Sequence, residues 1–328
     1  MRTRATRRGL HLTELGLGAA QFGNLYRETT DEQAAGAVEA AWDAGIRYFD
    51  TAPHYGLGLS ERRLGALLRQ HPRDEYVVSS KVGRLLVPSP ESAGQVDDAG
   101  FAVPAAYRRE WDFSRDGILR SLESTLERTG LDHLDIVYLH DPDDHLEQAL
   151  GEGIQTLIEL REQGVVRAVG AGMNQAEALA ALIRVADVDL VMLAGRYTLL
   201  EQGAAHDLLP LAVERGVGIV IAGVYNTGLL SSARPDASAK YDYEDAPPGL
   251  ISRANAIADV CERHGVTLPE AALAFPLLHP AVVSVVVGMR DAAQVTSTVD
   301  RYSTPIPDAL WSDLRAASLL PASLSDHL

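Results

Sequence analysis

Four side chains that can move a proton stand at or near the ends of short, mainly apolar runs of this sequence. They are Asp50, Tyr55, Lys81 and His140. The acid, the amine and the imidazole each close such a run, and the phenol follows the acid by five residues. If the runs are neighbouring parallel strands, which lie about 5 Å apart, the four groups meet at one edge of a sheet. Such a set can deliver a proton to a carbonyl oxygen or take one from an alcohol.

Apolar runs of this kind alternate with amphipathic segments along the whole chain. The runs are 15–19, 46–50, 76–81, 134–140, 165–169, 190–193, 218–221 and 282–287. Between them, apolar residues at helical spacing fall in 33–44, 117–128, 154–162, 176–185, 207–215 and 252–263, and several of these segments end at a glycine. Eight strand–helix units predict an α/β protein with a single-domain (β/α)8 TIM barrel, in which catalytic residues lie at the carboxyl ends of the strands.

The predicted domain organisation is simple. Residues 1–10 are basic and lack the apolar core of a signal peptide, so we expect a flexible N-terminal tail. Residues 11–328 form the barrel. Two long connections, 84–113 and 228–250, are rich in Pro, Gly and Ser, and they are predicted on the active-site face as lids or disordered loops.

Composition excludes several classes of protein. The 328 residues carry a net charge of −16, which argues against extensive nucleic-acid binding. No stretch approaches the roughly 18 apolar residues of a membrane helix. The single cysteine, Cys261, excludes an intrachain disulfide and suits a cytoplasmic protein. The oligomeric state is left open.

Two sharper motifs offer alternatives. Residues 16–21 (GLGAAQ) begin like a dinucleotide-binding glycine fingerprint, but Gln21 stands where the last glycine belongs. The segment from His140 to His145 contains ligand types for a divalent metal, which leaves a metal-dependent barrel hydrolase conceivable. However, Pro142 breaks any helix that would align the two histidines. No metal is predicted.

The combined pattern resembles the aldo-keto reductase superfamily over almost the whole chain. The resemblance rests on DTAPHYG at 50–56, KVG at 81–83, DIVYLH at 135–140, and GVVRAVG at 164–170 followed by Asn174. Within the superfamily, GNLY at 23–26, KVGRLL at 81–86 and HDPD at 140–143 are similar to the L-fucose and D-threo-aldose 1-dehydrogenase group. L-galactose and pyridoxal 4-dehydrogenases belong to the same neighbourhood.

The resemblance assigns catalytic roles to the four residues. Tyr55 is the general acid or base, and His140 orients the reacting oxygen. Asp50 holds Lys81 in place and charged. A cation about 4 Å from the phenol is worth about 4 kcal/mol at an effective dielectric near 20, so we expect Lys81 to lower the pKa of Tyr55 by up to roughly three units.

The resemblance also indicates where a nicotinamide cofactor binds. The predicted contacts are Asn174, Gly223, Tyr225, Asn226, Gly228, Gly288, Arg290 and Gln294. Backbone amides of the 223–228 segment are expected around the pyrophosphate. Arg290 is expected to pair with the 2′-phosphate of adenosine, which favours NADP, with NAD as the alternative.

The predicted function is therefore that of a cytoplasmic NAD(P)-dependent oxidoreductase. The most specific hypothesis is oxidation of an L-fucose-like aldose at C1 to the lactone. A general aldehyde or pyridoxal reductase is the alternative within this class, and a nicotinamide-binding regulatory subunit is the alternative outside it. The predicted partner is a small sugar or aldehyde substrate.

Overall fold

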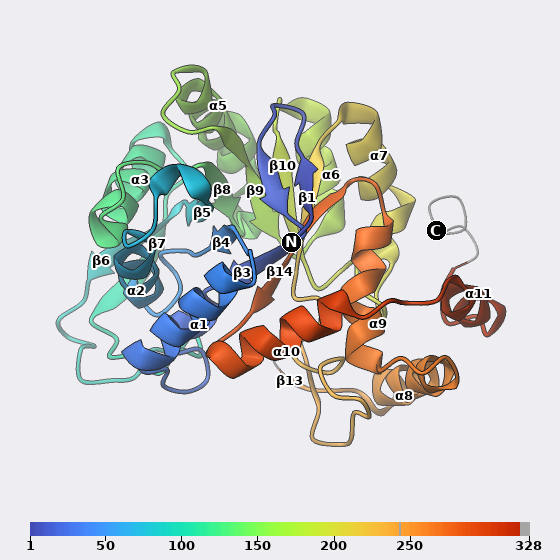
Figure 1. Cartoon of the computed structure of the whole chain (residues 1–328). Helices are drawn as coiled ribbons and strands as arrows, with labels where there is room; N and C mark the ends of the chain where they lie inside the picture. Colours follow the sequence, from blue (N-terminus) through green and yellow to red (C-terminus); the bar gives the residue numbers. More distant parts are fainter. Residues whose placement is uncertain (243, 322–328) are drawn as a thin grey trace.

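Eight parallel strands form a closed barrel in which spatial order follows chain order (Figure 1). They are β3 (Leu15–Gly18), β4 (Tyr48–Asp50), β5 (Val77–Val82), β8 (Ile136–His140), β9 (Ala168–Met173), β10 (Leu190–Ala194), β11 (Gly218–Ala222) and β14 (Val282–Gly288). Pairing of β14 with β3 and of β9 with β10 closes the ring. The predicted (β/α)8 barrel is confirmed.

The structure is a computed structural model that describes residues 1–242 and 244–321. Residue 243, within the predicted loop 228–250, lies outside the described residues. So do residues 322–328, at the end of the predicted domain 11–328.

The strands are buried on both faces, which explains their nearly continuous apolar sequences. Their inward-facing side chains fill the barrel as a packed core. This interior cluster comprises Leu10, Leu12, Tyr48, Val77, Ile136, Tyr138, Ala168, Leu190, Met192, Val220, Val283 and Val286. The barrel interior is therefore closed, and the strand ends are left as the place for a site.

Helices surround the barrel (Figure 1). They are α1 (Asp31–Asp43), α2 (Leu59–Leu68), α3 (Arg115–Thr129), α4 (Leu146–Gln148), α5 (Ile154–Glu162), α6 (Ala176–Val185), α7 (Leu208–Arg215), α8 (Pro248–Arg263), α9 (Leu268–Ala274), α10 (Ala292–Ser303) and α11 (Asp308–Ala316). The first begins at a capping box in which Thr30 and Gln33 satisfy each other's backbone amides. Among the described helices, none is both long and apolar enough to cross a membrane.

The N-terminal prediction was wrong. Residues expected as a flexible tail form a hairpin, in which β1 (Thr3–Ala5) pairs antiparallel with β2 (His11–Thr13). The Arg4 guanidinium donates to Glu14 and to the carbonyls of Leu277 and Val282, so this arginine ties the hairpin to the rest of the protein. Leu10 and Leu12 plug the amino-terminal end of the barrel.

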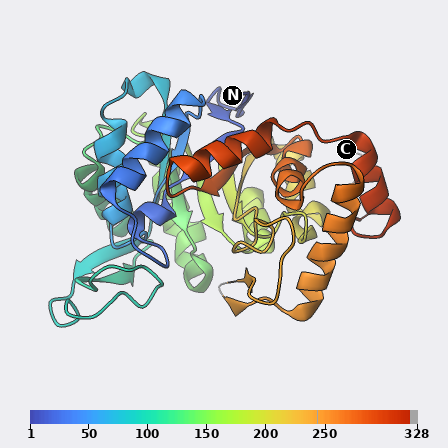
Figure 2. The ribbon, with the colours of Figure 1, turned by 60° about the horizontal axis from the view of Figure 1, so that its bottom comes forward.

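The two long connections contain structure of their own. Residues 84–113 include a hairpin of β6 (Arg84–Pro88) and β7 (Tyr107–Trp111), and residues 228–250 include the short pair β12 (Lys240–Tyr241) and β13 (Glu244–Asp245). Figure 2 shows both segments on the side of the molecule away from the N-terminus. This is the side to which the carboxyl ends of the barrel strands point.

Candidate active site

The four residues singled out in the sequence come together at the carboxyl ends of β4, β5 and β8. Lys81 Nζ donates to Asp50 Oδ2 at 2.7 Å and to Tyr55 Oη at 3.0 Å. The rings of Tyr55 and His140 lie edge to face with their centroids 5.9 Å apart. An amine, a phenol and an imidazole thus surround one point, as the alternation of strands and helices predicts.

The ion pair beneath the phenol is fully buried and fully hydrogen-bonded. Lys81 is 2% exposed and Asp50 is 3% exposed. The third Lys81 hydrogen bond goes to the Thr51 carbonyl at 3.0 Å, and Ser79 Oγ donates to Asp50 Oδ1 at 2.7 Å. Because no donor of the ammonium is spare, its position relative to Tyr55 is fixed.

Close backbone contact positions the turn that carries Tyr55. A Cβ on Gly23 would lie 2.5 Å from the Tyr55 carbonyl carbon, and one on Gly56 would lie 2.3 Å from the Gly23 oxygen. Gly56 also has φ +62°, which favours glycine. Two glycines distant in sequence therefore allow the loops after β3 and β4 to touch.

Electrostatics at Tyr55 differ from the prediction. Burial raises the pKa of Tyr55 above its ordinary value, and Asp50 adds to this, while the charge of Lys81 opposes the shift without reversing it. Burial alone would lower the pKa of Lys81, but the charge of Asp50 and the phenol of Tyr55 raise it above the usual value. The resting pair is therefore an ammonium and a protonated phenol, ready to act as an acid.

His140 is a neutral imidazole. Burial, followed by the charges of Arg84 and Lys81, lowers its pKa well below the ordinary value. Arg84 Nη2 donates to Asp141 Oδ2 at 2.5 Å, which places an ion pair beside the ring. His140 Nδ1 is buried and has no hydrogen-bond partner among the described residues. A neutral ring can accept or donate one hydrogen bond to a reacting oxygen.

A cavity of about 860 Å³ runs from Asp50 and Tyr55 to the amino-terminal end of α10. This volume suits a dinucleotide-sized ligand. Gln21 lines it, and its Oε1 is buried without a partner among the described residues. A Cβ on Gly288 would lie 2.4 Å from Gln21 Nε2, so glycine there makes room for this amide. A polar amide at the wall of this cavity fits a ligand that carries hydrogen-bonding groups.

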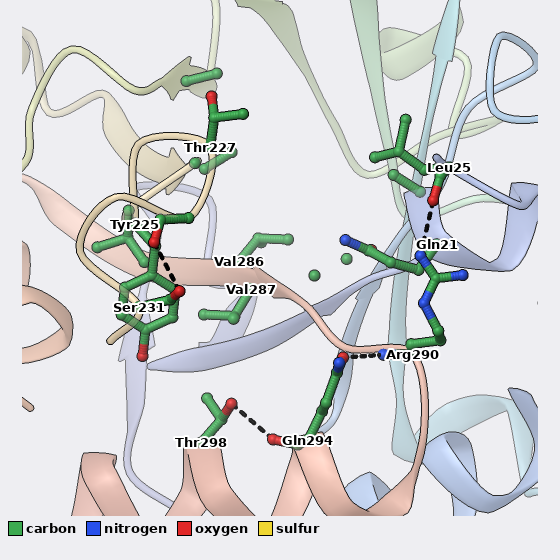
Figure 3. A pocket seen from close by; sticks show the side chains of 18 of the residues that line it. Gln21, Leu25, Tyr225, Thr227, Ser231, Val286, Val287, Arg290, Gln294 and Thr298 are labelled. Carbon is green, nitrogen blue, oxygen red and sulfur yellow. Dashed lines mark hydrogen bonds between the residues drawn. The ribbon is translucent and has the colours of Figure 1, made fainter. Parts of the chain in front are cut away.

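Arg290 lines the cavity, but its side chain is hydrogen-bonded to a loop of the protein. Its guanidinium is buried and donates to the carbonyls of Leu25 at 2.7 Å and Arg27 at 3.0 Å, and to the Thr29 hydroxyl. Figure 3 shows the side chain directed at Leu25. The residue thus lines the cavity and also anchors the loop after β3. Its pairing with a 2′-phosphate stays a prediction.

The other seven predicted cofactor contacts all line the cavity, but the side chains of two of them are already hydrogen-bonded within the protein. Asn174, Gly223, Tyr225, Gly228, Gly288 and Gln294 line the cavity, and so does Asn226. However, Asn226 Oδ1 accepts a hydrogen bond from the Thr198 hydroxyl at 2.7 Å, and Asn226 Nδ2 donates to the Gly195 carbonyl at 3.0 Å. Gln294 Oε1 likewise accepts from the Arg290 backbone amide at 2.8 Å (Figure 3). These two side chains shape the cavity instead of facing it with free polar groups.

Some functional side chains escaped the sequence argument. Ser79 was not predicted, because a single serine inside an apolar run does not indicate a role. Its position two residues before Lys81 was the available signal, since it places both side chains on the same face of the strand. Gln21 was noted only for spoiling a glycine fingerprint. Within residues 1–242 and 244–321, no three His, Cys, Asp or Glu side chains are grouped so that they could hold a metal ion.

Comparison with known proteins places this geometry in a family. The sequence model of the aldo/keto reductase family matches residues 14–318. A D-threo-aldose 1-dehydrogenase from a Pseudomonas species is 50% identical over 316 residues, which cover 95% of this chain and 96% of that protein. A pyridoxal 4-dehydrogenase from Microbacterium luteolum is 39% identical, with 96% of each chain covered. A solved aldo-keto reductase from Bacillus halodurans, in its holo form, superimposes with a TM-score of 0.74 at 24% identity, over 98% of this chain and 97% of its own.

The chain belongs to the aldo/keto reductase family. It is an oxidoreductase that uses a nicotinamide cofactor, and the resemblance found in the sequence is confirmed. The buried Lys81–Asp50 pair lies directly below Tyr55, at the site that the sequence predicted for this chemistry.

Proposed function

We propose that the protein oxidises an aldose at C1 to the lactone, with a nicotinamide dinucleotide as the electron acceptor. The observation that carries the proposal is the hydrogen bond of 3.0 Å from Lys81 Nζ to Tyr55 Oη, over an ion pair that is closed to solvent. The substrate class is supported by the 50% identity to a D-threo-aldose 1-dehydrogenase over almost the whole chain. The single cysteine supports the cytoplasm as its compartment.

The side chains of this protein handle the proton of the reaction. Oxidation removes a hydride from C1 and a proton from the C1 hydroxyl, and bound nicotinamide supplies the hydride acceptor. Tyr55 Oη takes the hydroxyl proton as the phenolate, which Lys81 stabilises across the hydrogen bond. His140, as a neutral ring, directs the hydroxyl oxygen toward Tyr55. In carbonyl reduction, the same phenol is already protonated and acts as the acid.

We propose NAD as the preferred cofactor, in place of the predicted NADP. The Arg290 guanidinium is hydrogen-bonded to carbonyls of the loop after β3. The charged groups that affect its pKa are Arg27 and Asp291, which carry opposite charges. The Arg290 guanidinium already donates to these loop carbonyls and to the Thr29 hydroxyl, so it has little donor capacity left for a 2′-phosphate. NADP remains the alternative, because Arg27 and Arg301 also line the cavity.

The test is a substrate panel followed by absorbance at 340 nm with NAD and with NADP. We expect reduction of NAD with L-fucose and other aldoses, in amounts that match lactone formed. Pyridoxal is the second substrate to assay, because a pyridoxal 4-dehydrogenase is 39% identical. Cofactor binding without turnover of any aldose or aldehyde would contradict an enzymatic function and favour a regulatory subunit.

A further inference from the structure

A second histidine, His54, stands beside the reacting groups without being one of the four catalytic residues. Its ring centroid lies 5.6 Å from that of His140 and 6.1 Å from that of Tyr55. The ring packs edge to face against Phe101 at 5.3 Å. A ligand held between Tyr55 and His140 would therefore have His54 within reach of the atoms next to its reacting carbon.

The protonation of His54 is set by a residue from the β6–β7 hairpin. Arg109 Nε donates to His54 Nδ1 at 2.5 Å, and Arg109 Nη2 donates to the His54 carbonyl at 3.1 Å. An arginine can only donate, so Nδ1 is an acceptor and the ring hydrogen is carried by Nε2. Burial, with the charges of Arg84 and Arg109, lowers the pKa of His54 to about 2, so the ring is neutral.

Arg109 is itself held by a buried carboxylate. Its Nη1 and Nη2 donate to the two oxygens of Asp97 at 2.6 and 2.9 Å, and the two side chains are 8% and 3% exposed. A buried ion pair gains little net stability, because desolvation of both charges offsets their attraction. A pair of this kind that ends on a ring nitrogen in an active site is better explained by the orientation it gives to that ring.

We propose that His54 is a substrate-positioning residue, whose Nε2–H donates to the hydroxyl oxygen on the carbon next to the reacting carbon. Asp97 and Arg109 keep that hydrogen on Nε2. The substrates selected are thus polyhydroxylated carbonyl compounds and their hemiacetals, over aldehydes without a neighbouring hydroxyl. The inference rests on the proposed aldose oxidation.

The first experiment compares two sugars on two enzymes. L-fucose and 2-deoxy-L-fucose differ only at the hydroxyl next to C1. With the wild type, kcat/KM should be about 10- to 100-fold higher for L-fucose, the range for a hydrogen bond lost inside a site. In His54→Phe, which keeps an aromatic ring, the two sugars should be oxidised with kcat/KM values within about threefold of each other. His54→Gln, which keeps a donor at a similar reach, should recover part of the preference.

A second experiment tests the tautomer without catalysis. In the wild type, ¹⁵N NMR should show His54 Nδ1 without hydrogen and Nε2 with it. Arg109→Leu, combined with Asp97→Leu so that no buried charge is left alone, should lose this signature and the preference for L-fucose. Arg108→Leu is the matched control, because Arg108 is exposed on the same strand and pairs with Glu110. Arg108→Leu should keep both the NMR signature of His54 and the preference for L-fucose.

The outcomes separate the two proposals. An equal preference for L-fucose in the wild type and in His54→Phe would overturn the role of His54 and leave aldose oxidation standing. A hydrogen on Nδ1 in the wild type would overturn the role of Arg109. A wild type that oxidises neither sugar would overturn the aldose function, and with it the substrate class inferred here.

Discussion

The two ends of the active-site cavity differ in how their polar groups are used. At the ends of β4 and β5, Asp50 and Lys81 form an ion pair that aims the ammonium at Tyr55. At the dinucleotide end, Arg290 and Asn226 are bonded to the protein's own loops. At the first end, the polar groups are arranged around the phenol that would contact a substrate. At the second end, these two side chains hold loops in place and so determine the shape of the cavity.

This difference follows from where the residues stand. A strand end is fixed by its neighbours in the barrel, so a side chain there has one position. A long side chain in a connection can reach many acceptors, and carbonyls of another loop compete with a ligand for it. Residue type therefore indicates function more safely at strand ends than in the connections.

The largest expected effect is at the phenol. Tyr55→Phe removes the proton acceptor, so turnover should fall by about 10²-fold or more. Cofactor affinity should stay within about twofold, as titration by tryptophan fluorescence would show. Tyr107→Phe, an exposed ring on the hairpin, is the matched control. Turnover of Tyr55→Phe within about threefold of wild type would remove Tyr55 from the proton path.

Lys81→Met should have the next largest effect. Without the ammonium, the pKa of Tyr55 rises further, so oxidation at neutral pH should fall by about 10- to 10³-fold and recover in part as the pH is raised. Unfolding should become easier by about 3–5 kcal/mol, because the partner carboxylate stays buried alone. The matched control is Lys240→Met, the other lysine of the chain, which pairs with an exposed Asp245. An unchanged pH–rate profile would show that Lys81 does not tune the base.

The pH dependence of the wild type should reflect the same group. Burial raises the pKa of Tyr55, so the phenolate fraction grows with pH, and kcat/KM for oxidation should rise about tenfold per unit up to at least about pH 9. His140 has its pKa well below 6.5, so it should add no inflection near neutrality. A plateau reached below about pH 8 would mean that the base titrates lower than its burial implies.

The smallest expected effect is the most diagnostic for the dinucleotide end. Arg290→Ala loosens the loop after β3, so NAD and NADP should both bind about three- to tenfold more weakly. Glu28→Ala is the control, since the Glu28 side chain is exposed on that same loop and is not among the residues that line the cavity. If NADP alone weakened by 10-fold or more, Arg290 would be a phosphate ligand after all, and the two ends of the cavity would be alike.

Much of the fold could be predicted from the sequence, because apolar strands alternate with amphipathic helices that end at glycines. The fifth strand was placed too early. It was expected at 165–169, but it spans Ala168–Met173, and Val165 is 41% exposed. Glycine weakens strand propensity, yet Gly170 is required here, because a Cβ would lie 1.6 Å from the Leu190 oxygen.

The remaining errors concern contacts between distant segments. The N-terminal hairpin has strands of three residues, and its arginines find partners such as Glu14 and Asp189. Arg109 and Asp97 likewise meet inside a connection that has no periodic pattern. No local sequence pattern indicates that such residues will pair. The four catalytic candidates were predicted because each stands at or just after the end of a recognisable strand.

The central claim is that the site takes a hydride from C1 of an aldose while Tyr55 takes the proton. The most direct measurement uses L-fucose labelled with deuterium at C1, incubated with NAD, and mass spectrometry of the reduced cofactor. We expect the deuterium of C1 to appear in the reduced nicotinamide in the same amount as the lactone formed. In Tyr55→Phe, the rate at which both form should fall by about 10²-fold or more. Reduced cofactor that carries no deuterium would contradict this claim.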